Sequence, residues 1–131
     1  MAVEAVFDTS VLIAFLKREP EWATIERWLG RSGAISALTM QELVSKAVDG
    51  GMATDEAAAL PADLGLLVHP LTEQLAIEAG AMIAVTRSRG LSHGDRACLA
   101  LSRALGLPAV TADRAWAEVA GPLGVTVELV R

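Results

Sequence analysis

The sequence predicts an α/β fold in which a mostly parallel sheet lies between layers of helices. Short apolar runs alternate along the chain with longer segments of helical periodicity, which is the pattern of parallel strands joined by helical crossovers. Hydrophobic residues make up 53% of the chain and charged residues 21%, a composition that builds a core and excludes the disordered class. The length of 131 residues predicts a single domain, residues 1–131.

Five apolar runs predict the strands. The first extends from Val3 to Phe7 and is followed directly by Asp8. The other four are 34–37, 66–68, 109–111 and 125–130. Runs this short and this rich in aliphatic residues are typical of strands that are buried on both faces.

Segments with apolar residues at helical spacing predict the helices between these strands. They are 8–17, 21–29, 39–48, 54–60, 72–87, 94–105 and 113–119. Pro61 is expected to end the helix before it, because proline removes a helical hydrogen bond. Gly106 is expected to end the helix that starts near Gly94.

The charge balance gives no simple RNA-binding surface. The net charge is -5, whereas phosphate contacts normally come from clustered Lys and Arg. Five of the eleven basic residues fall in one late stretch, namely Arg87, Arg89, Arg96, Arg103 and Arg114. Bound divalent cations would also reverse the field of an acidic pocket. Modules that stack bases on aromatic platforms are disfavoured, because the chain has no tyrosine and only two phenylalanines.

The single cysteine, Cys98, can form neither an intramolecular disulfide nor a thiolate metal site. Its apolar helical surroundings predict a buried, inert thiol. The sequence shows no targeting segment and no run approaching the ~20 apolar residues that span a bilayer. We therefore expect a cytoplasmic protein that does not bind membranes.

Four acids are placed so that they can meet at one edge of the sheet. Asp8 directly follows the first strand, and Asp113 directly follows the fourth. Glu42 lies in the first turn of the helix after the second strand, and Asp95 starts the helix before the fourth. Ligands of open parallel sheets bind outside the carboxyl ends of the strands. The four carboxylates are therefore expected to converge there.

Such a cluster needs compensation. Two carboxylates about 4 Å apart repel by roughly 4 kcal/mol at an effective dielectric constant of 20. Several pairs would rival the ~5–15 kcal/mol stability of a whole domain, so the cluster requires a cation, a shared proton or an arginine. Oxygen ligands favour Mg²⁺ or Mn²⁺ over zinc. These ions activate water and stabilise in-line attack on phosphorus, so the pattern predicts metal-assisted phosphodiester hydrolysis.

Each acid taken alone also has a structural explanation. Asp8 fits a helix N-cap, and Thr39-x-x-Glu42 fits a capping box. Asp95 and Asp113 fit acids at helix starts, which the helix dipole stabilises. The combination of all four, rather than any single acid, indicates function.

Neighbouring polar residues are auxiliary candidates. Ser10 and Thr111 have hydroxyls suited to a metal-bound water or a phosphate, although capping and turn formation explain them equally well. Arg96 and Arg114 are suited either to binding RNA or to neutralising the acids. His93 reads as a solvated loop residue.

The strings that carry these residues occur in a characteristic order. They are VFDTSVLIAFL (6–16), ISALTMQELVSKA (35–47) and LSHGDRACLALSRALGLPAVTADRAW (91–116). They resemble PIN-domain nucleases, and most of all the VapC-type toxins of bacterial toxin–antitoxin pairs. The resemblance covers nearly the whole chain and implies a PIN-domain-like three-layer α/β/α sandwich.

The resemblance also implies roles for the matching positions. Asp8 matches the first metal-binding aspartate, Glu42 the glutamate, Asp95 the aspartate of G-D-R, and Asp113 that of T-A-D-R. It implies a Mg²⁺-dependent endoribonuclease, with Mn²⁺ as a substitute, that cuts tRNA or rRNA. It further implies a homodimer inhibited by a cognate antitoxin protein. We expect Asp8 and Asp95 to be metal ligands, and Glu42 and Asp113 to be ligands directly or through water.

Two other classes of function remain as alternatives. One is a catalytically silent interaction protein on the same scaffold, against which the intact set of acids speaks. The other is a phosphatase that uses a phosphoaspartate. Such enzymes have a second Asp two residues after the first, whereas position 10 is Ser, so this alternative is disfavoured.

Overall fold

The computed structural model describes residues 2–131, and its five strands form one sheet in the order β3-β2-β1-β4-β5. The strands are β1 (Ala5–Phe7), β2 (Gly33–Ser36), β3 (Leu66–His69), β4 (Ala109–Thr111) and β5 (Val127–Leu129). Each neighbouring pair is parallel, so all carboxyl ends lie at one edge of the sheet. The strand order reverses between β1 and β4, which is where open α/β sheets bind their ligands.

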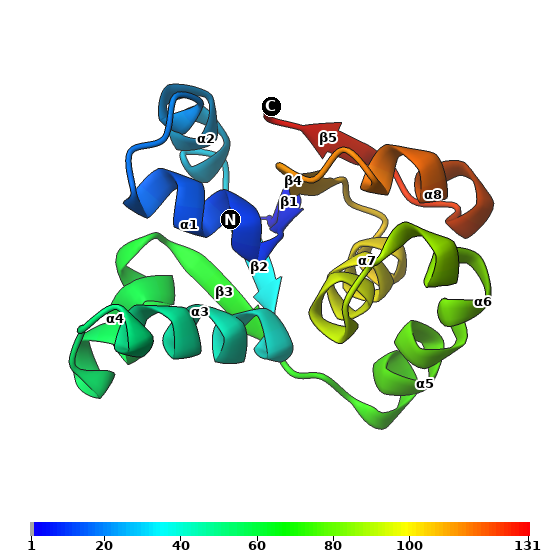
Figure 1. Ribbon diagram of the computed structural model, residues 1–131, viewed down its shortest axis with the longest axis horizontal. Helices are drawn as coiled ribbons and strands as arrows, with labels where there is room; N and C mark the ends of the chain where they lie inside the picture. Colours follow the sequence, from blue (N-terminus) through cyan, green and yellow to red (C-terminus); the bar gives the residue numbers. More distant parts are fainter. Residues whose placement is uncertain (1) are drawn as a thin grey trace.

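Helices cover both faces of the sheet. They are α1 (Thr9–Leu16), α2 (Trp22–Leu29), α3 (Ala37–Asp49), α4 (Thr54–Asp63), α5 (Glu73–Ala81), α6 (Ile83–Thr86), the 3₁₀ helix η1 (Arg87–Arg89), α7 (His93–Leu105) and α8 (Trp116–Leu123). In Figure 1, α1 to α4 lie on one side of the strands and α5 to α8 on the other. No helix within residues 2–131 is long and apolar enough to cross a bilayer.

The two helical layers enclose separate cores, because side chains of a strand alternate between its faces. Val6 of β1 belongs to the core under α5, α7 and α8, whereas Ala5 and Phe7 belong to the core under α1, α2 and α3. The architecture is therefore a three-layer α/β/α sandwich with a parallel sheet, as the sequence predicts.

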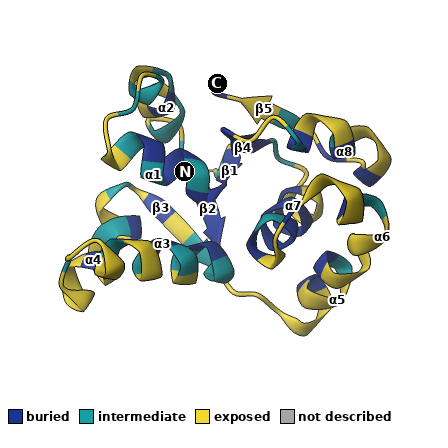
Figure 2. Ribbon diagram, in the orientation of Figure 1, coloured by how far each residue is buried: buried dark blue, intermediate teal, exposed yellow. Residues whose placement is uncertain are grey.

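The most deeply buried helix is α7, which lies next to the central strands (Figure 2). Its buried residues include Gly94, Arg96 and the run 97–102. A capping box fixes its start: the Ser92 hydroxyl accepts from the Asp95 backbone N–H, and Asp95 Oδ2 accepts from the Ser92 N–H. The acid that precedes the fourth strand is thus held rigidly at the start of a buried helix.

The predicted extent of the helix at 72–87 and the predicted helix end before Pro61 are wrong. The segment 72–87 is not one helix, since α5 ends at Ala81 and is followed by α6 and η1. The Thr86 hydroxyl donates to the Met82 carbonyl, a bond that bends helices. Pro61 does not end its helix either, because α4 continues to Asp63. Proline near a helix end removes only one late hydrogen bond, which the helix tolerates.

Candidate functional site

Asp8 is buried where β1 meets α1, with 3% of its surface exposed. It occupies the N-cap position of α1, but its side chain makes no capping hydrogen bond. Its Oδ2 atom instead accepts from the Ser10 hydroxyl at 2.6 Å and from the Thr111 hydroxyl at 2.9 Å. The structural explanation of Asp8 as a capping side chain is therefore wrong.

The two hydroxyls that hold Asp8 are themselves oriented by the turn after β4. The Ala112 backbone N–H donates to Ser10 Oγ at 3.2 Å, and the Asp113 N–H donates to Thr111 Oγ1 at 3.0 Å. Since each hydroxyl accepts from a backbone amide, its single proton is directed to Asp8. This network ties the carboxyl ends of β1 and β4 together.

Glu42 is not part of the expected capping box. The N-cap of α3 is Ser36, whose hydroxyl accepts from the Leu38 N–H, so Thr39 lies inside the helix and is fully buried. Glu42 Oε1 accepts from the Thr9 hydroxyl at 3.0 Å. Its carboxylate is therefore engaged across helices rather than with its own backbone.

Asp8, Glu42 and Asp95 lie close enough to influence common groups. Burial raises the pKa of Asp8 from 3.8 to about 6, and the charge of Asp95 adds to the rise while the Ser10 and Thr111 hydrogen bonds oppose it. Burial, followed by the charges of Asp8, Asp95 and Glu42, raises the pKa of the Cys98 thiol well above its usual value. The charges of three of the four predicted acids thus act on the same buried thiol on α7.

Asp113 lies at the rim of this cluster. It is exposed, and its Oδ1 accepts from the Ala115 N–H at 3.0 Å in a turn that precedes α8. The predicted helix start at this residue is wrong, because α8 begins at Trp116. Asp113 is nevertheless linked to Asp8 through Thr111. The structure places its backbone, rather than its carboxylate, in the hydrogen-bond network.

A hollow of about 380 Å³ lies beside Asp113. It is lined by Ser10, Ala112, Asp113, Arg114 and Arg131. Arg114 is exposed there, whereas Arg131 pairs with Glu19 and Glu21. An exposed guanidinium next to the acids is suited to a phosphate group.

Arg96 is placed differently, with only 6% of its surface exposed. Its Nη1 donates to the Leu91 carbonyl at 2.9 Å, and its Nη2 lies 2.9 Å from His93 Nδ1. His93 is the first residue of α7 rather than a loop residue. These contacts brace the start of α7, and any contact of Arg96 with substrate remains a prediction.

The donor set suits a hard divalent cation. The four carboxylates offer oxygen ligands, and each has an oxygen that accepts an orienting hydrogen bond. Within residues 2–131, no group of three or more His, Cys, Asp or Glu side chains is arranged to hold a metal ion. Mg²⁺ is commonly bound through one or two carboxylates and keeps several waters, so these residues fit such an ion. They do not form a closed cage of the zinc or calcium type.

No arginine compensates the cluster. The ion pairs formed within residues 2–131 involve Arg31, Arg89 and Arg131, and none of them includes one of the four acids. A pKa of about 6 leaves Asp8 mostly ionised at neutral pH, so a shared proton gives only partial relief. The arrangement can therefore attract a cation.

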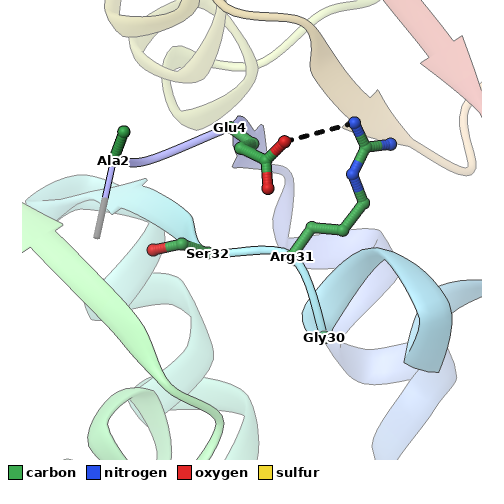
Figure 3. A pocket seen from close by; sticks show the side chains of 5 residues that line it. All are labelled: Ala2, Glu4, Gly30, Arg31 and Ser32. Carbon is green, nitrogen blue, oxygen red and sulfur yellow. Dashed lines mark hydrogen bonds and ion pairs between the residues drawn. The ribbon is translucent and has the colours of Figure 1, made fainter.

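The opposite edge of the sheet has a second hollow of about 390 Å³ (Figure 3). It is lined by Ala2, Glu4, Gly30, Arg31 and Ser32. Glu4 and Arg31 pair there at 3.5 Å, and both side chains are about half exposed. Because the two charges compensate each other in solvent, the described residues that line this hollow leave no unpaired charge that would attract a ligand. None of the predicted site residues lines it.

Sequence reasoning missed three residues of the acidic site. Ser92 has a readable signal, because Ser92-x-x-Asp95 matches the capping-box pattern. Thr9 has no local signal, since Glu42 lies 33 residues away. Gly94 lies against the Glu42 carboxylate, a contact that only the fold brings about.

Solved structures with the same architecture include one described as a toxin and one described as a toxin–antitoxin complex from Klebsiella pneumoniae. VapC20 of Mycobacterium tuberculosis, described as a toxin that cleaves the sarcin–ricin loop, aligns with a TM-score of 0.70 and 19% identity over 85% of this chain and 91% of that one. A chain of DNA-bound VapBC from Salmonella typhimurium aligns with a TM-score of 0.72 and 20% identity over 99% and 100%. A chain of FitAcB from Neisseria gonorrhoeae aligns with a TM-score of 0.67 and 18% identity over 96% and 97%. At these identities the likeness concerns the fold.

Sequence comparison gives the family assignment. No curated protein sequence matches the chain. The family model described as the PIN domain matches residues 5–122, which include all four acids and every strand except β5. The resemblance inferred from the sequence strings is confirmed, and the chain belongs to the PIN domain family.

Proposed function

We propose that this protein is a Mg²⁺- or Mn²⁺-dependent endoribonuclease and the toxin of a toxin–antitoxin pair. The observation that carries the proposal is the buried, hydroxyl-anchored Asp8, whose neighbours Asp95 and Glu42 are also acidic and whose charge no arginine within residues 2–131 pairs. PIN-domain membership and the likeness to VapC20, described as cleaving the sarcin–ricin loop, support a structured RNA such as ribosomal RNA as substrate. Transfer RNA is the second candidate, from the resemblance of the sequence strings alone.

The residues would share the work as follows. Asp8 and Asp95 hold the ion, with Glu42 and Asp113 as ligands directly or through water. When bound, the ion supplies activation of water and stabilisation of charge during in-line attack on phosphorus. Ser10 and Thr111 keep the Asp8 carboxylate in one orientation. Arg114 faces the hollow beside Asp113 and would bind a neighbouring phosphate of the RNA.

A cleavage assay tests the enzymatic part. Ribosomal and transfer RNA are incubated with the wild type and Mn²⁺, with the wild type and EDTA, and with Asp8→Asn and Mn²⁺. We expect strong cleavage only in the first reaction, with a loss on the order of 10²–10³-fold in the others, the size typical of removing one group that stabilises the charge of a transition state. Glu4→Gln, at the opposite edge, is the matched control and retains activity. Equal cleavage in all reactions would point instead to a silent interaction protein.

The partnership and assembly are proposed on separate grounds. Several neighbouring structures are toxin–antitoxin complexes, which supports an antitoxin that covers the acidic site. Ile77 on α5 is 59% exposed and Ile83 on α6 is 37% exposed, and such exposed apolar side chains support a homodimer. Light scattering of the wild type and of Ile77→Glu tests the dimer. Co-expression with the protein encoded by a short neighbouring reading frame tests the antitoxin, and unchanged toxicity would contradict it.

A further inference from the structure

The Glu42 carboxylate lies between two residues that have no assigned role, Thr9 and Gly94. Thr9 is the first residue of α1 and is 3% exposed, and its hydroxyl donates to Glu42 Oε1 at 3.0 Å. Gly94 is the second residue of α7 and is buried. A Cβ atom there would overlap Oε1 and lie 2.7 Å from Oε2. Three helices therefore enclose one carboxylate.

The Thr9 hydroxyl has no local task in its own helix. The N-cap position of α1 is Asp8, and the hydrogen bond of the Thr9 hydroxyl crosses to Glu42 on α3. Thr86 offers the contrast: it is equally buried, but its hydroxyl donates to the Met82 carbonyl one turn earlier in sequence. A buried threonine with a role only in its own helix donates to a carbonyl of that helix, as Thr86 does. The Thr9 hydroxyl instead donates to the Glu42 carboxylate.

Gly94 adds a boundary on the other side. A Cβ at position 94 would meet the carboxylate at the flexible end of the Glu42 side chain. The glutamate could therefore change its rotamer, and the helices would not have to separate. Alanine is also more favourable than glycine inside a helix. The glycine at this position is therefore explained by the place of the carboxylate rather than by the backbone of α7.

We propose that Thr9 is a positioning residue for Glu42 and that Gly94 leaves the space its carboxylate occupies. The inference rests on the proposed function, because it assigns a task within the same acidic site. A free glutamate side chain samples many rotamers and loses considerable entropy when fixed. The Thr9 hydrogen bond and the close approach of Gly94 restrict the Glu42 carboxylate beforehand to one position, beside the starts of α1 and α7. Groups that orient ligands in this way typically change metal affinity or activity by 10–100-fold when removed.

The first test compares Thr9→Val, Thr9→Ser and the matched control Thr86→Val. Mn²⁺ affinity is measured by calorimetry, RNA cleavage as kcat/KM, and folding by thermal melting. We expect Thr9→Val to lower Mn²⁺ affinity and kcat/KM by about 10–100-fold, Thr9→Ser to restore both, and Thr86→Val to change neither. Wild-type Mn²⁺ affinity in Thr9→Val, with Asp8→Asn inactive, would overturn the positioning role and leave the nuclease in place. Wild-type protein that neither binds Mn²⁺ nor cuts RNA would overturn both.

The second test uses Gly94→Ala, with Gly80→Ala on α5 as control, because a Cβ at Gly80 meets nothing within 4 Å. Both variants should melt no lower than the wild type, since alanine favours helix. Only Gly94→Ala should lose Mn²⁺ affinity and cleavage, again by about 10–100-fold. Unchanged Mn²⁺ affinity in Gly94→Ala would contradict the proposal that Gly94 leaves space for the Glu42 carboxylate. This test does not depend on whether a Thr9 variant folds.

Discussion

The two edges of the sheet have hollows of nearly equal size, about 390 and 380 Å³. The edges differ in how their charged side chains are paired and buried. At the edge formed by the amino ends of the strands (the amino edge), Glu4 and Arg31 form an exposed ion pair, with about half of each side chain accessible to solvent. At the carboxyl edge, Asp8 is buried near acids of the same sign. An exposed pair of opposite charges is nearly self-sufficient, whereas buried like charges destabilise the fold until something binds. Burial of unpaired charge, rather than the volume of a hollow, therefore distinguishes the functional edge.

The largest expected effect on stability comes from removing the buried charge. Without metal, in EDTA, Asp8→Asn should raise the free energy of unfolding at pH 7.5 by about 3 kcal/mol, because the Asp8 pKa is about 6 in the fold and 3.8 outside it. The folded state holds the proton more tightly, so the contribution of Asp8 to stability falls as the pH rises from about 4 to above 6. Urea unfolding across this range measures it.

The gain of Asp8→Asn should shrink as the pH falls toward about 4 and disappear at about pH 3, where the wild-type carboxyl is mostly protonated in both states. Asparagine keeps a carbonyl oxygen that can accept from Ser10 and Thr111, so the hydrogen-bond network is retained. If the variant is less stable than the wild type at pH 7.5, the buried charge of Asp8 does not destabilise the fold and the contrast between the edges fails.

Metal binding should produce the next largest effect. Mn²⁺ at 100 times its dissociation constant should stabilise the wild type by about 2.7 kcal/mol, because it binds the folded state. Asp8→Asn should show little of this stabilisation, while Glu4→Gln should show all of it. Thermal melting with and without Mn²⁺ measures both. Equal metal stabilisation of the wild type and Asp8→Asn would place the ion elsewhere.

The smallest effect is expected at the amino edge. Glu4→Gln removes the partner of Arg31 but should change the free energy of unfolding by less than about 1 kcal/mol, since both side chains are half exposed. Adding salt should reduce even this difference, because exposed ion pairs are screened. A larger loss in urea unfolding would mean that the amino edge contributes more than its solvent exposure suggests.

Features that depend on neighbours in the sequence could be predicted. Each strand follows from a short apolar run, and the parallel sheet follows from the helices between the runs. The positions of Asp8 and Asp113 could be predicted because each directly follows a strand, and the carboxyl ends of parallel strands lie at the same edge of the sheet. The predicted Thr39 capping box is wrong for a local reason too: Ser36 is both the last residue of β2 and the N-cap of α3, so no loop separates the strand from the helix.

Features that depend on contacts between distant helices could not be predicted. The bond between Thr9 and Glu42 joins residues 33 positions apart, and the bond between Thr111 and Asp8 joins residues 103 positions apart. Their strength comes from burial, which propensity and spacing do not report. The interruption after Ala81 is similar, because the segment 72–87 keeps helical periodicity although the chain bends around α7.

The buried cysteine offers a practical consequence. Cys98 is fully buried, and its thiol resists ionisation first because of that burial and then because of the charges of Asp8, Asp95 and Glu42, which together raise its pKa well above the usual value. Since only the thiolate attacks alkylating reagents, modification requires that α7 first separate from the sheet. The chain has no other cysteine, so the rate of labelling of the unaltered protein reports how often the floor of the acidic cluster opens, and how far a divalent ion or a protein inhibitor slows that opening.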